Sequence, residues 1–134
     1  MMQSPYSFVF VLMLLGHMVA DYTLQGWLAN GKCKSWWEKQ CTPEEMEKYK
    51  NDYRCAMLCH AFYWSAITFM PLLLLSRFSA VAQFWYTIIV LVNTPIHYLV
   101  DDLKANKRAI TLWTDQGLHL FQIAMTLVVW RVLI

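Results

Sequence analysis

The stretch SFVFVLMLLGHMVADYTLQ, from Ser7 to Gln25, decides the fold class of this chain. Its first half is almost pure hydrocarbon, whereas its second half carries His17, Asp21 and Gln25 at intervals of four residues. A bilayer core takes about 20 apolar residues per helix, and residues four apart share one face of a helix. The stretch therefore predicts a membrane-spanning helix with a polar stripe near one end.

The composition of the whole chain is typical of a membrane protein. Its 134 residues are 58% hydrophobic and only 15% charged, whereas a soluble domain carries about 25% charged residues. The net charge of +2 is too small to favour nucleic acid as a partner. We therefore expect an integral membrane protein whose main partner is the lipid bilayer, with no nucleic-acid ligand.

Four segments are long and apolar enough to span a bilayer, at about residues 6–29, 55–76, 80–103 and 109–134. Backbone groups in lipid must be hydrogen-bonded internally, and short loops force antiparallel neighbours. We therefore predict a single all-α transmembrane domain over residues 1–134, an integral membrane four-helix bundle. Ser4 and Pro5 are expected to cap and begin the first span.

The polar segment 30–54 is the long loop between the first two predicted spans. In this loop, Thr42, Pro43 and Glu45 match a capping box with proline in the first turn, which predicts a helix. Trp36 and Trp37 suit the head-group layer, so we expect this helix at the membrane interface. The loop is also the expected contact surface for a second copy or a membrane-protein partner.

Basic residues gather on one side of the predicted membrane. Nine lie in the first and third loops, whereas Arg77 and at most Arg131 lie on the other side. The positive-inside rule then predicts a bacterial inner-membrane protein with both termini in the periplasm and loop 30–54 in the cytoplasm. The nine are Lys32, Lys34, Lys39, Lys48, Lys50, Arg54, Lys104, Lys107 and Arg108.

The four cysteines, Cys33, Cys41, Cys55 and Cys59, lie in or beside the same loop. In the cytoplasm they are expected to be reduced thiols, and a disulfide would contradict the predicted topology. Cys55 and Cys59 lie close to His60 in the sequence, so a second zinc site is an alternative there, although the chain has no CxxC pair that would support it.

Each predicted span holds one of the four histidines, and three of these have an aspartate four residues away. Residues four apart share a helix face, and spans of alternating direction bring these faces to one depth. We therefore predict that all seven side chains converge at one level near the cytoplasmic leaflet. They are His60, which stands alone, and the pairs His17 with Asp21, His97 with Asp101, and Asp115 with His119.

Convergence of these residue types predicts a metal site. An ionisable residue at the centre of a membrane helix costs about 2.5–3.5 kcal/mol, and a divalent metal bound by imidazole and carboxylate offsets that cost. We expect zinc, manganese or iron, as one or two ions. The candidate ligands are His17, Asp21, His60, His97, Asp101, Asp115 and His119, and the candidate catalytic groups are His60 and Asp21.

Polar residues inside a membrane protein can also serve two roles that need no metal. Interhelical hydrogen bonding alone places such residues between membrane helices, and it is the expected role of Asn93 and the simplest role for Gln25. An ion pathway would need polar residues through the whole bilayer depth. Because the stretches SFVFVLMLL and AMTLVVW are nearly pure hydrocarbon, the sequence disfavours a transport route.

The ordered motifs resemble those of domain-of-unknown-function family 3307, small polytopic membrane proteins of bacteria and their phages. HMVADYTLQGWLANGKCKSW, His60, HYLVDDLK and DQGLH follow the pattern HxxxDxxLQ, H, HxxxDxxK and DQxxH. The resemblance covers residues 17–119 and departs from the pattern in the charge-rich loop 32–54. It favours Asp101 over Asp102 as the functional aspartate. It also implicates three substrate-binding candidates, Gln25, Lys104 and Gln116.

These features predict an intramembrane metal-dependent hydrolase. A substrate that enters from the lipid or the interface would be a phospholipid or an isoprenoid phosphate, with Lys104 on its phosphate. The alternative is a non-enzymatic, metal-stapled interaction protein, such as a phage-encoded modulator of a host membrane protein. An open ligand position beside an accessible cavity favours the enzyme, whereas a closed site favours the alternative.

Overall fold

The computed structural model describes residues 5–134, and within them the chain is helical with no strand. Four long elements are joined by one long connection of short helices and by two short loops. The all-α class is confirmed. In chain order the elements are α1 (Pro5–Met18), η1 (Val19–Thr23), α2 (Leu28–Gly31), α3 (Lys34–Gln40), α4 (Pro43–Tyr49), α5 (Asp52–Leu75), α6 (Ala80–Ala105) and α7 (Leu112–Leu133).

The first predicted span ends six residues earlier than the sequence suggested, at Thr23 rather than residue 29. After Met18 the helix widens into the π-helical turn η1, in which the Leu24 N–H donates to the Val19 carbonyl at 2.9 Å. The backbone then leaves the helix, and Gly26 takes a φ of +50°, a conformation that glycine adopts without strain. The prediction was wrong here because apolar residues continue past the turn. Ser4, the expected cap, lies outside the described residues.

The connection from α2 to α4 contains the predicted loop helix. Thr42 Oγ1 accepts a hydrogen bond from the Glu45 N–H, and the Glu45 carboxylate accepts one from the Thr42 N–H. This capping box, with Pro43 in the first turn, confirms the predicted helix start. Trp27, Trp36 and Trp37 pack edge to face beside it. The connection is therefore a structured arm rather than an open loop.

Three of the long elements are apolar enough to cross a membrane: Pro5–Thr23, Asp52–Leu75 and Leu112–Leu133. Helix α6 is longer, with 26 residues, but it is not among them. Its polar residues, among them Gln83, Asn93 and His97, lower its mean hydropathy. The chain thus has the helices of a membrane protein, and its described spans begin or end up to six residues from the predicted limits.

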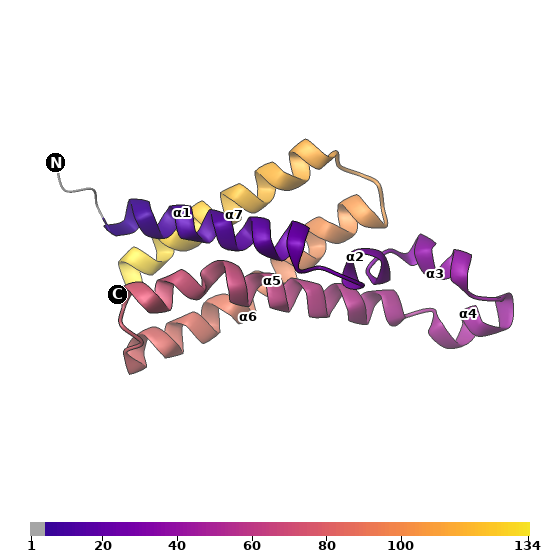
Figure 1. The fold of residues 1–134 in the computed structure, drawn as a ribbon, viewed down its shortest axis with the longest axis horizontal. Helices are drawn as coiled ribbons and strands as arrows, with labels where there is room; N and C mark the ends of the chain where they lie inside the picture. Colours follow the sequence, from indigo (N-terminus) through magenta and orange to yellow (C-terminus); the bar gives the residue numbers. More distant parts are fainter. Residues whose placement is uncertain (1–4) are drawn as a thin grey trace.

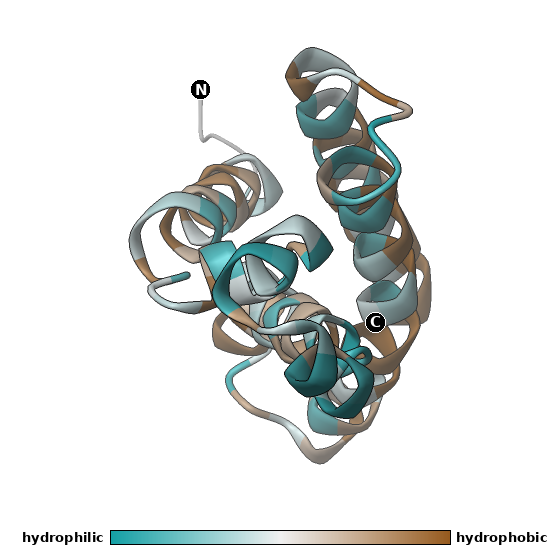
Figure 2. Ribbon diagram, turned by 90° about the vertical axis from the view of Figure 1, so that its right-hand side faces the viewer, coloured by the Kyte–Doolittle hydropathy of each residue, from teal (hydrophilic) through white to brown (hydrophobic). Residues whose placement is uncertain are grey.

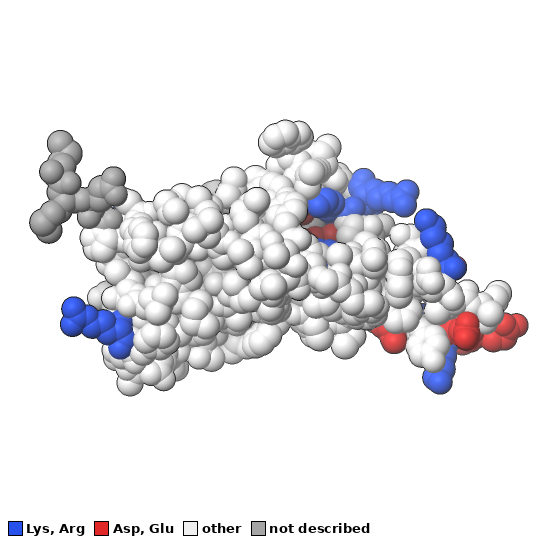
Figure 3. All heavy atoms as spheres, viewed as in Figure 1, with Lys and Arg blue, Asp and Glu red and all other residues white. Residues whose placement is uncertain are grey.

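The long helices run in alternating directions, so the start of α1 and the C-terminus lie at one end and the arm α2–α4 at the other (Figure 1). Seen from the arm, the short helices are mostly hydrophilic, and the long helices behind them carry most of the apolar residues (Figure 2). On the face shown in Figure 3, charged side chains gather at the arm end and are absent from the long middle. This distribution is what a bilayer around the middle of the helices requires.

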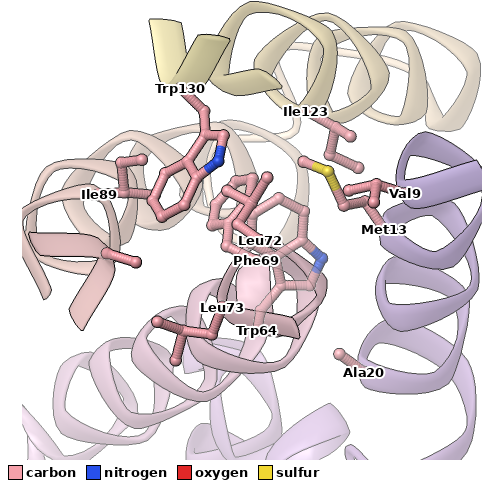
Figure 4. Packing of buried hydrophobic residues seen from close by; sticks show 11 residues of the cluster. Val9, Met13, Ala20, Trp64, Phe69, Leu72, Leu73, Ile89, Ile123 and Trp130 are labelled. Atoms are coloured by element: carbon pink, nitrogen blue, oxygen red, sulfur yellow. The ribbon is translucent and has the colours of Figure 1, made fainter. Parts of the chain in front are cut away.

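The apolar core lies toward the end with the termini, where α1, α5 and α7 meet. Met13, Trp64 and Ile123 point into a shared space and are fully buried (Figure 4). Helices α1 and α5 approach closely, because a Cβ on Gly16 would lie 3.1 Å from the Ile67 carbonyl oxygen and equally close to Thr68 Cα. Small residues allow such close contact between membrane helices. Gly16 therefore fixes the position of the residue that follows it, His17.

A second buried contact joins α6 to α7, and we call it the amide cluster: Asn93, Gln122 and Thr126. The Gln122 amide donates to both the carbonyl and the Oδ1 of Asn93, at 3.0 and 2.9 Å. The Thr126 hydroxyl donates to the same Oδ1 at 3.2 Å. The expected role of Asn93 as an interhelical hydrogen bonder is confirmed.

Candidate metal centre

Near the arm, the long helices enclose four histidines and three aspartates, which we call the His/Asp cluster. None of these side chains is more than 7% exposed. They come from all four long elements and contact one another across the helices, so the predicted convergence is confirmed. Their roles as ligands or catalytic groups stay predictions. The members are His17, Asp21, His60, His97, Asp101, Asp115 and His119.

Three atoms in this cluster have the spacing of metal ligands. Asp21 Oδ1 lies 3.3 Å from His60 Nε2 and 3.9 Å from His97 Nε2, and the two nitrogens are 3.3 Å apart. In a tetrahedral zinc site with metal–nitrogen distances of about 2.0–2.1 Å, neighbouring ligand atoms lie about 3.3–3.4 Å apart. These three residues could therefore hold a metal ion.

A second group that could hold a metal consists of His97, Asp101 and His119. Asp101 Oδ1 lies 3.2 Å from His119 Nε2 and 3.6 Å from His97 Nε2, and its other oxygen lies 3.3 Å from His60 Nε2. Both groups use Nε2 of His97, and an imidazole nitrogen has only one lone pair. The two groups therefore cannot both hold an ion through His97 at once.

The same contacts also hold the cluster together without a metal. An imidazole Nε2–H can donate to a carboxylate at these distances, as His119 does to Asp101 at 3.2 Å. In that state the proton sits on Nε2, whereas metal binding through Nε2 requires it on Nδ1. A proton on Nε2 of each ring thus fits a purely structural cluster, whereas a proton on Nδ1 leaves Nε2 free to bind a metal.

Five buried atoms of the cluster have no hydrogen-bond partner within residues 5–134: Asp21 Oδ1, Asp115 Oδ1 and Nδ1 of His60, His97 and His119. Buried polar atoms are normally paired, and exceptions cluster at functional sites or where water or an ion is bound. The carboxylate oxygen of Asp21 stands out among them, because it makes no hydrogen bond although it lies 3.3 and 3.9 Å from two imidazole nitrogens. A cation among these atoms would satisfy it.

Trp64 forms the floor of the cluster. Its indole stacks on the His97 ring, with centroids 4.0 Å apart and planes at 15°, and it also contacts the rings of His17 and His119. Trp64 is fully buried on α5, four residues after His60. It closes the cluster off from the apolar core and holds three imidazoles in place.

His17 takes part in a hydrogen-bonded chain rather than in either metal group. The Trp64 indole N–H donates to His17 Nδ1 at 2.9 Å, which leaves the His17 proton on Nε2, where it is shared with Gln116 Oε1 at 3.1 Å. The Gln116 amide in turn donates to Asp115 Oδ2 at 2.9 Å. Because both ring nitrogens are engaged, His17 orients Gln116 and Asp115.

Two lysines balance the carboxylates. Lys32 Nζ lies 2.5 Å from Asp101 Oδ2, and Lys104 Nζ lies 3.2 Å from Asp115 Oδ2. Asn106 at the end of α6 holds the arm in place, because its amide donates to the Lys32 carbonyl at 3.2 Å. With neutral histidines, the two ammonium groups leave one of the three carboxylate charges uncompensated. A divalent cation would reverse this sign and suit an anionic ligand.

A small polar cavity of about 50 Å³ opens onto the cluster. It gives access to the carboxylates of Asp21, Asp101 and Asp115, and its volume suffices for a few water molecules. All three predicted substrate-binding residues line it together with Lys32: Gln25, Lys104 and Gln116. A ligand in the cavity could therefore contact both lysines and the three carboxylates.

Asp101 and Asp102 take different positions, as the resemblance implied. Asp101 lies inside the cluster, whereas Asp102 is 3.3 Å from Lys107 Nζ and accepts a hydrogen bond from Asn106. The four cysteines are free thiols, and Cys55 and Cys59 are exposed while His60 is buried in the cluster. Within the described chain, neither metal group contains a cysteine, so the second zinc site is not formed.

Two residues of the site, Trp64 and Lys32, are not among those that the sequence predicts. Trp64 had a usable signal, since it follows His60 by four residues on one helix face. Lys32 had none, because the arm brings it to Asp101 across 69 positions of sequence, and it was counted only as a basic loop residue. A lysine in an irregular segment cannot be placed before the segment itself is placed.

Comparison with known proteins agrees with the motifs. The model of the family described as "Protein of unknown function (DUF3307)" matches residues 9–133. No curated protein and no solved structure matches the chain. The matched segment includes every residue of the His/Asp cluster and of the polar cavity beside it. The chain therefore belongs to the DUF3307 family, whose function is not known.

Proposed function

We propose that this protein is an intramembrane metal-dependent hydrolase that acts on a lipid phosphate near the cytoplasmic leaflet. The observation that carries the proposal is the unpaired, buried Asp21 Oδ1, which lies within 3.9 Å of two imidazole nitrogens at the edge of a water-sized polar cavity. Buried polar atoms without a hydrogen bond are typical of places where water or an ion is bound, and a cation beside this oxygen would satisfy it.

The proposal includes a membrane arrangement. All four long helices cross the bacterial inner membrane as a bundle, with both termini in the periplasm and segment 30–54 in the cytoplasm. The excess of basic residues at the arm end supports this orientation. Helix α6 crosses with its polar residues turned toward α5 and α7, where His97 and Asn93 are buried.

One divalent metal would take its ligands from among Asp21, His60, His97, Asp101 and His119, with zinc as the first candidate and manganese or iron as the others. When bound, the metal would supply Lewis acidity and a nucleophilic water at neutral pH. Asp21 and His60 lie 3.3 Å apart, so the one of them that does not bind the metal is placed to accept a proton. Lys32 and Lys104 would hold the substrate phosphate in the polar cavity.

The first test is elemental analysis of the protein purified in detergent, together with phosphate release from lipid phosphates in mixed micelles. We expect about one equivalent of metal per chain in the wild type, and loss of both metal and hydrolysis in His97→Ala and Asp101→Ala. Asp102→Ala is the matched control, because Asp102 lies next to Asp101 but outside the cluster. A metal-free wild type would rule out the proposal.

A second candidate function is the metal-stapled interaction protein. It is favoured by the arm α2–α4, whose tryptophans and charged tip project beyond the long helices (Figures 1 and 3). In this case the arm binds a membrane-protein partner or a second copy. Stoichiometric metal without hydrolysis of any lipid phosphate would favour it over the enzyme.

A further inference from the structure

A large hollow in the described chain is separate from the His/Asp cluster. It is a groove between α6 and α7 with a volume of about 490 Å³, within the range of about 300–1,000 Å³ of small-molecule sites. Apolar side chains line nearly all of it, including Ile96, Val100, Leu118 and Val129. The amide cluster holds the two helices together at its floor.

The groove leads to the polar cavity. On α6, Ile96, Val100 and Lys104 follow one another at intervals of four residues, so they share a helix face. On α7, Asp115 and Leu118 are three residues apart and share a face in the same way. The groove is lined by Ile96, Val100 and Leu118. The cavity is lined by Lys104 and Asp115, whose charged groups pair at 3.2 Å. The lining of the groove thus continues along α6 and α7 as one track, from the ion pair of Lys104 and Asp115 at the polar cavity to the apolar side chains of the groove.

The length of the track identifies its occupant. From Leu118 to Leu133, both of which line the groove, α7 rises about 22 Å at 1.5 Å per residue. Half of a hydrocarbon core is about 15 Å, so the groove is longer than one leaflet is thick and has room for one extended acyl chain that begins at the cytoplasmic side. A long carrier isoprenoid would overrun it. Lys32 and Lys104 at the open end are paired with Asp101 and Asp115, so the cavity has the net positive charge that suits a phosphate monoester only when the proposed divalent metal is bound.

We propose that the α6–α7 groove binds one acyl chain of a phospholipid whose phosphomonoester head group, as in phosphatidic acid, lies between Lys32 and Lys104. The placement of the head group rests on the proposed function. The placement of the acyl chain does not rest on the proposed function, because it is argued from the apolar lining and the length of the groove. Ordinary bilayer lipid also touches the outer faces of the helices, and a second apolar hollow of about 450 Å³ lies between α5 and α6. The α6–α7 groove differs from that hollow in leading to Lys104 and Asp115, so labelling confined to the α5–α6 hollow would also overturn the proposal.

The test uses phosphatidic acid with a diazirine on one acyl chain, in vesicles of phosphatidylethanolamine and phosphatidylglycerol that contain the full-length protein. After irradiation, we expect labelled peptides to map to the groove faces of α6 and α7. Unlabelled phosphatidic acid should compete, whereas diacylglycerol and a long isoprenoid phosphate should not. Even labelling of all long helices, or better competition by the isoprenoid, would overturn the proposal.

A matched pair of variants tests the groove itself. Val129 lines it, whereas the neighbouring Val128, which is exposed to a similar extent, does not. We expect Val129→Trp to lower labelling about tenfold, because an overpacked side chain fills the site, and Val128→Trp to leave it unchanged. Equal effects of the two variants would count against the groove. If Val129→Trp fails to fold, the labelling map of the wild type still decides.

The outcomes separate this proposal from the proposed function. Groove labelling in a protein that releases no phosphate would keep the lipid site and remove the hydrolase. Hydrolysis of phosphatidic acid with labelling spread over all helices would do the reverse. Cross-links between two copies through the α6–α7 faces would show that a second chain covers the groove, and would overturn the lipid site.

Discussion

Two buried polar clusters join the long helices, and they are built from different chemistry. The amide cluster uses neutral side chains, and only Gln122 Oε1 among its atoms lacks a partner within the described residues. The His/Asp cluster uses ionisable side chains and leaves five atoms unpaired. Interhelical hydrogen bonding needs no more than the amide cluster provides. The His/Asp cluster therefore exceeds what holding helices together requires.

The largest expected difference concerns removal of a carboxylate. Asp101→Ala should lower the free energy of unfolding by about 3–5 kcal/mol, because it leaves the Lys32 ammonium and two imidazoles without their shared acceptor. Asp102→Ala should cost at most about 1 kcal/mol, since its Lys107 partner is exposed. Unfolding in mixed micelles by titration with a denaturing detergent measures both. Equal losses would show that position 101 is not special.

The second largest expected effect is the loss of stability on metal removal, which should depend on the His/Asp cluster and not on the amide cluster. If the metal is present at about a hundredfold its dissociation constant, chelation should lower stability by about 2.7 kcal/mol. The loss should be the same in the wild type and in Asn93→Leu, and absent in Asp101→Ala. Calorimetry or thermal unfolding before and after dialysis against a chelator measures it. A chelator effect of the same size in Asp101→Ala would mean that the metal binds elsewhere.

Helix spacing gives a third contrast. Gly16→Ala should cost about 1–3 kcal/mol and weaken metal retention, because its Cβ would meet the backbone of α5 at 3.1 Å and shift His17. Gly117→Ala should instead stabilise by about 0.4–1 kcal/mol, because no atom lies within 4 Å of its Cβ and the change favours the helix. Effects of the same sign in both variants would contradict the close contact of α1 and α5.

The amide cluster should show the smallest effect. Interhelical hydrogen bonds in membranes contribute about 0.6 kcal/mol on average and at most about 1.7 kcal/mol. We expect the coupling energy between Asn93→Leu and Gln122→Leu in a double-mutant cycle to fall in this range, with metal content unchanged. Loss of metal in either single variant would mean that the two clusters act as one.

The His/Asp cluster could be predicted because it depends only on the spacing of residues along each segment and on the order of the segments. One histidine in each apolar segment, three of them with an aspartate four residues away, is enough to place the side chains at one depth once the segments alternate in direction. The capping box at Thr42 was equally readable, because it depends on local hydrogen bonds alone.

Features that depend on distances between helices or on irregular backbone were not predictable. Lys32 reaches Asp101 only because Asn106 and the short helices of the arm fold back over the cluster. The tautomer of His17 follows from Trp64, a partner on another helix. The groove arises from the separation of α6 and α7, and no local pattern encodes such a gap. The early end of the first helix depends on the π turn, which apolar periodicity does not reveal.

The π turn η1 makes the first helix tolerant of a change in chain length at one place. A π turn contains about one residue more than an α turn, so a chain that lacked Tyr22 would still form a regular helix there. His17 and Asp21 would keep their spacing, whereas Gln25, which follows the end of the helix, would be drawn one residue closer to it. A single-codon deletion would thus move Gln25 relative to the three carboxylates that line the cavity and leave the His17–Asp21 pair in place.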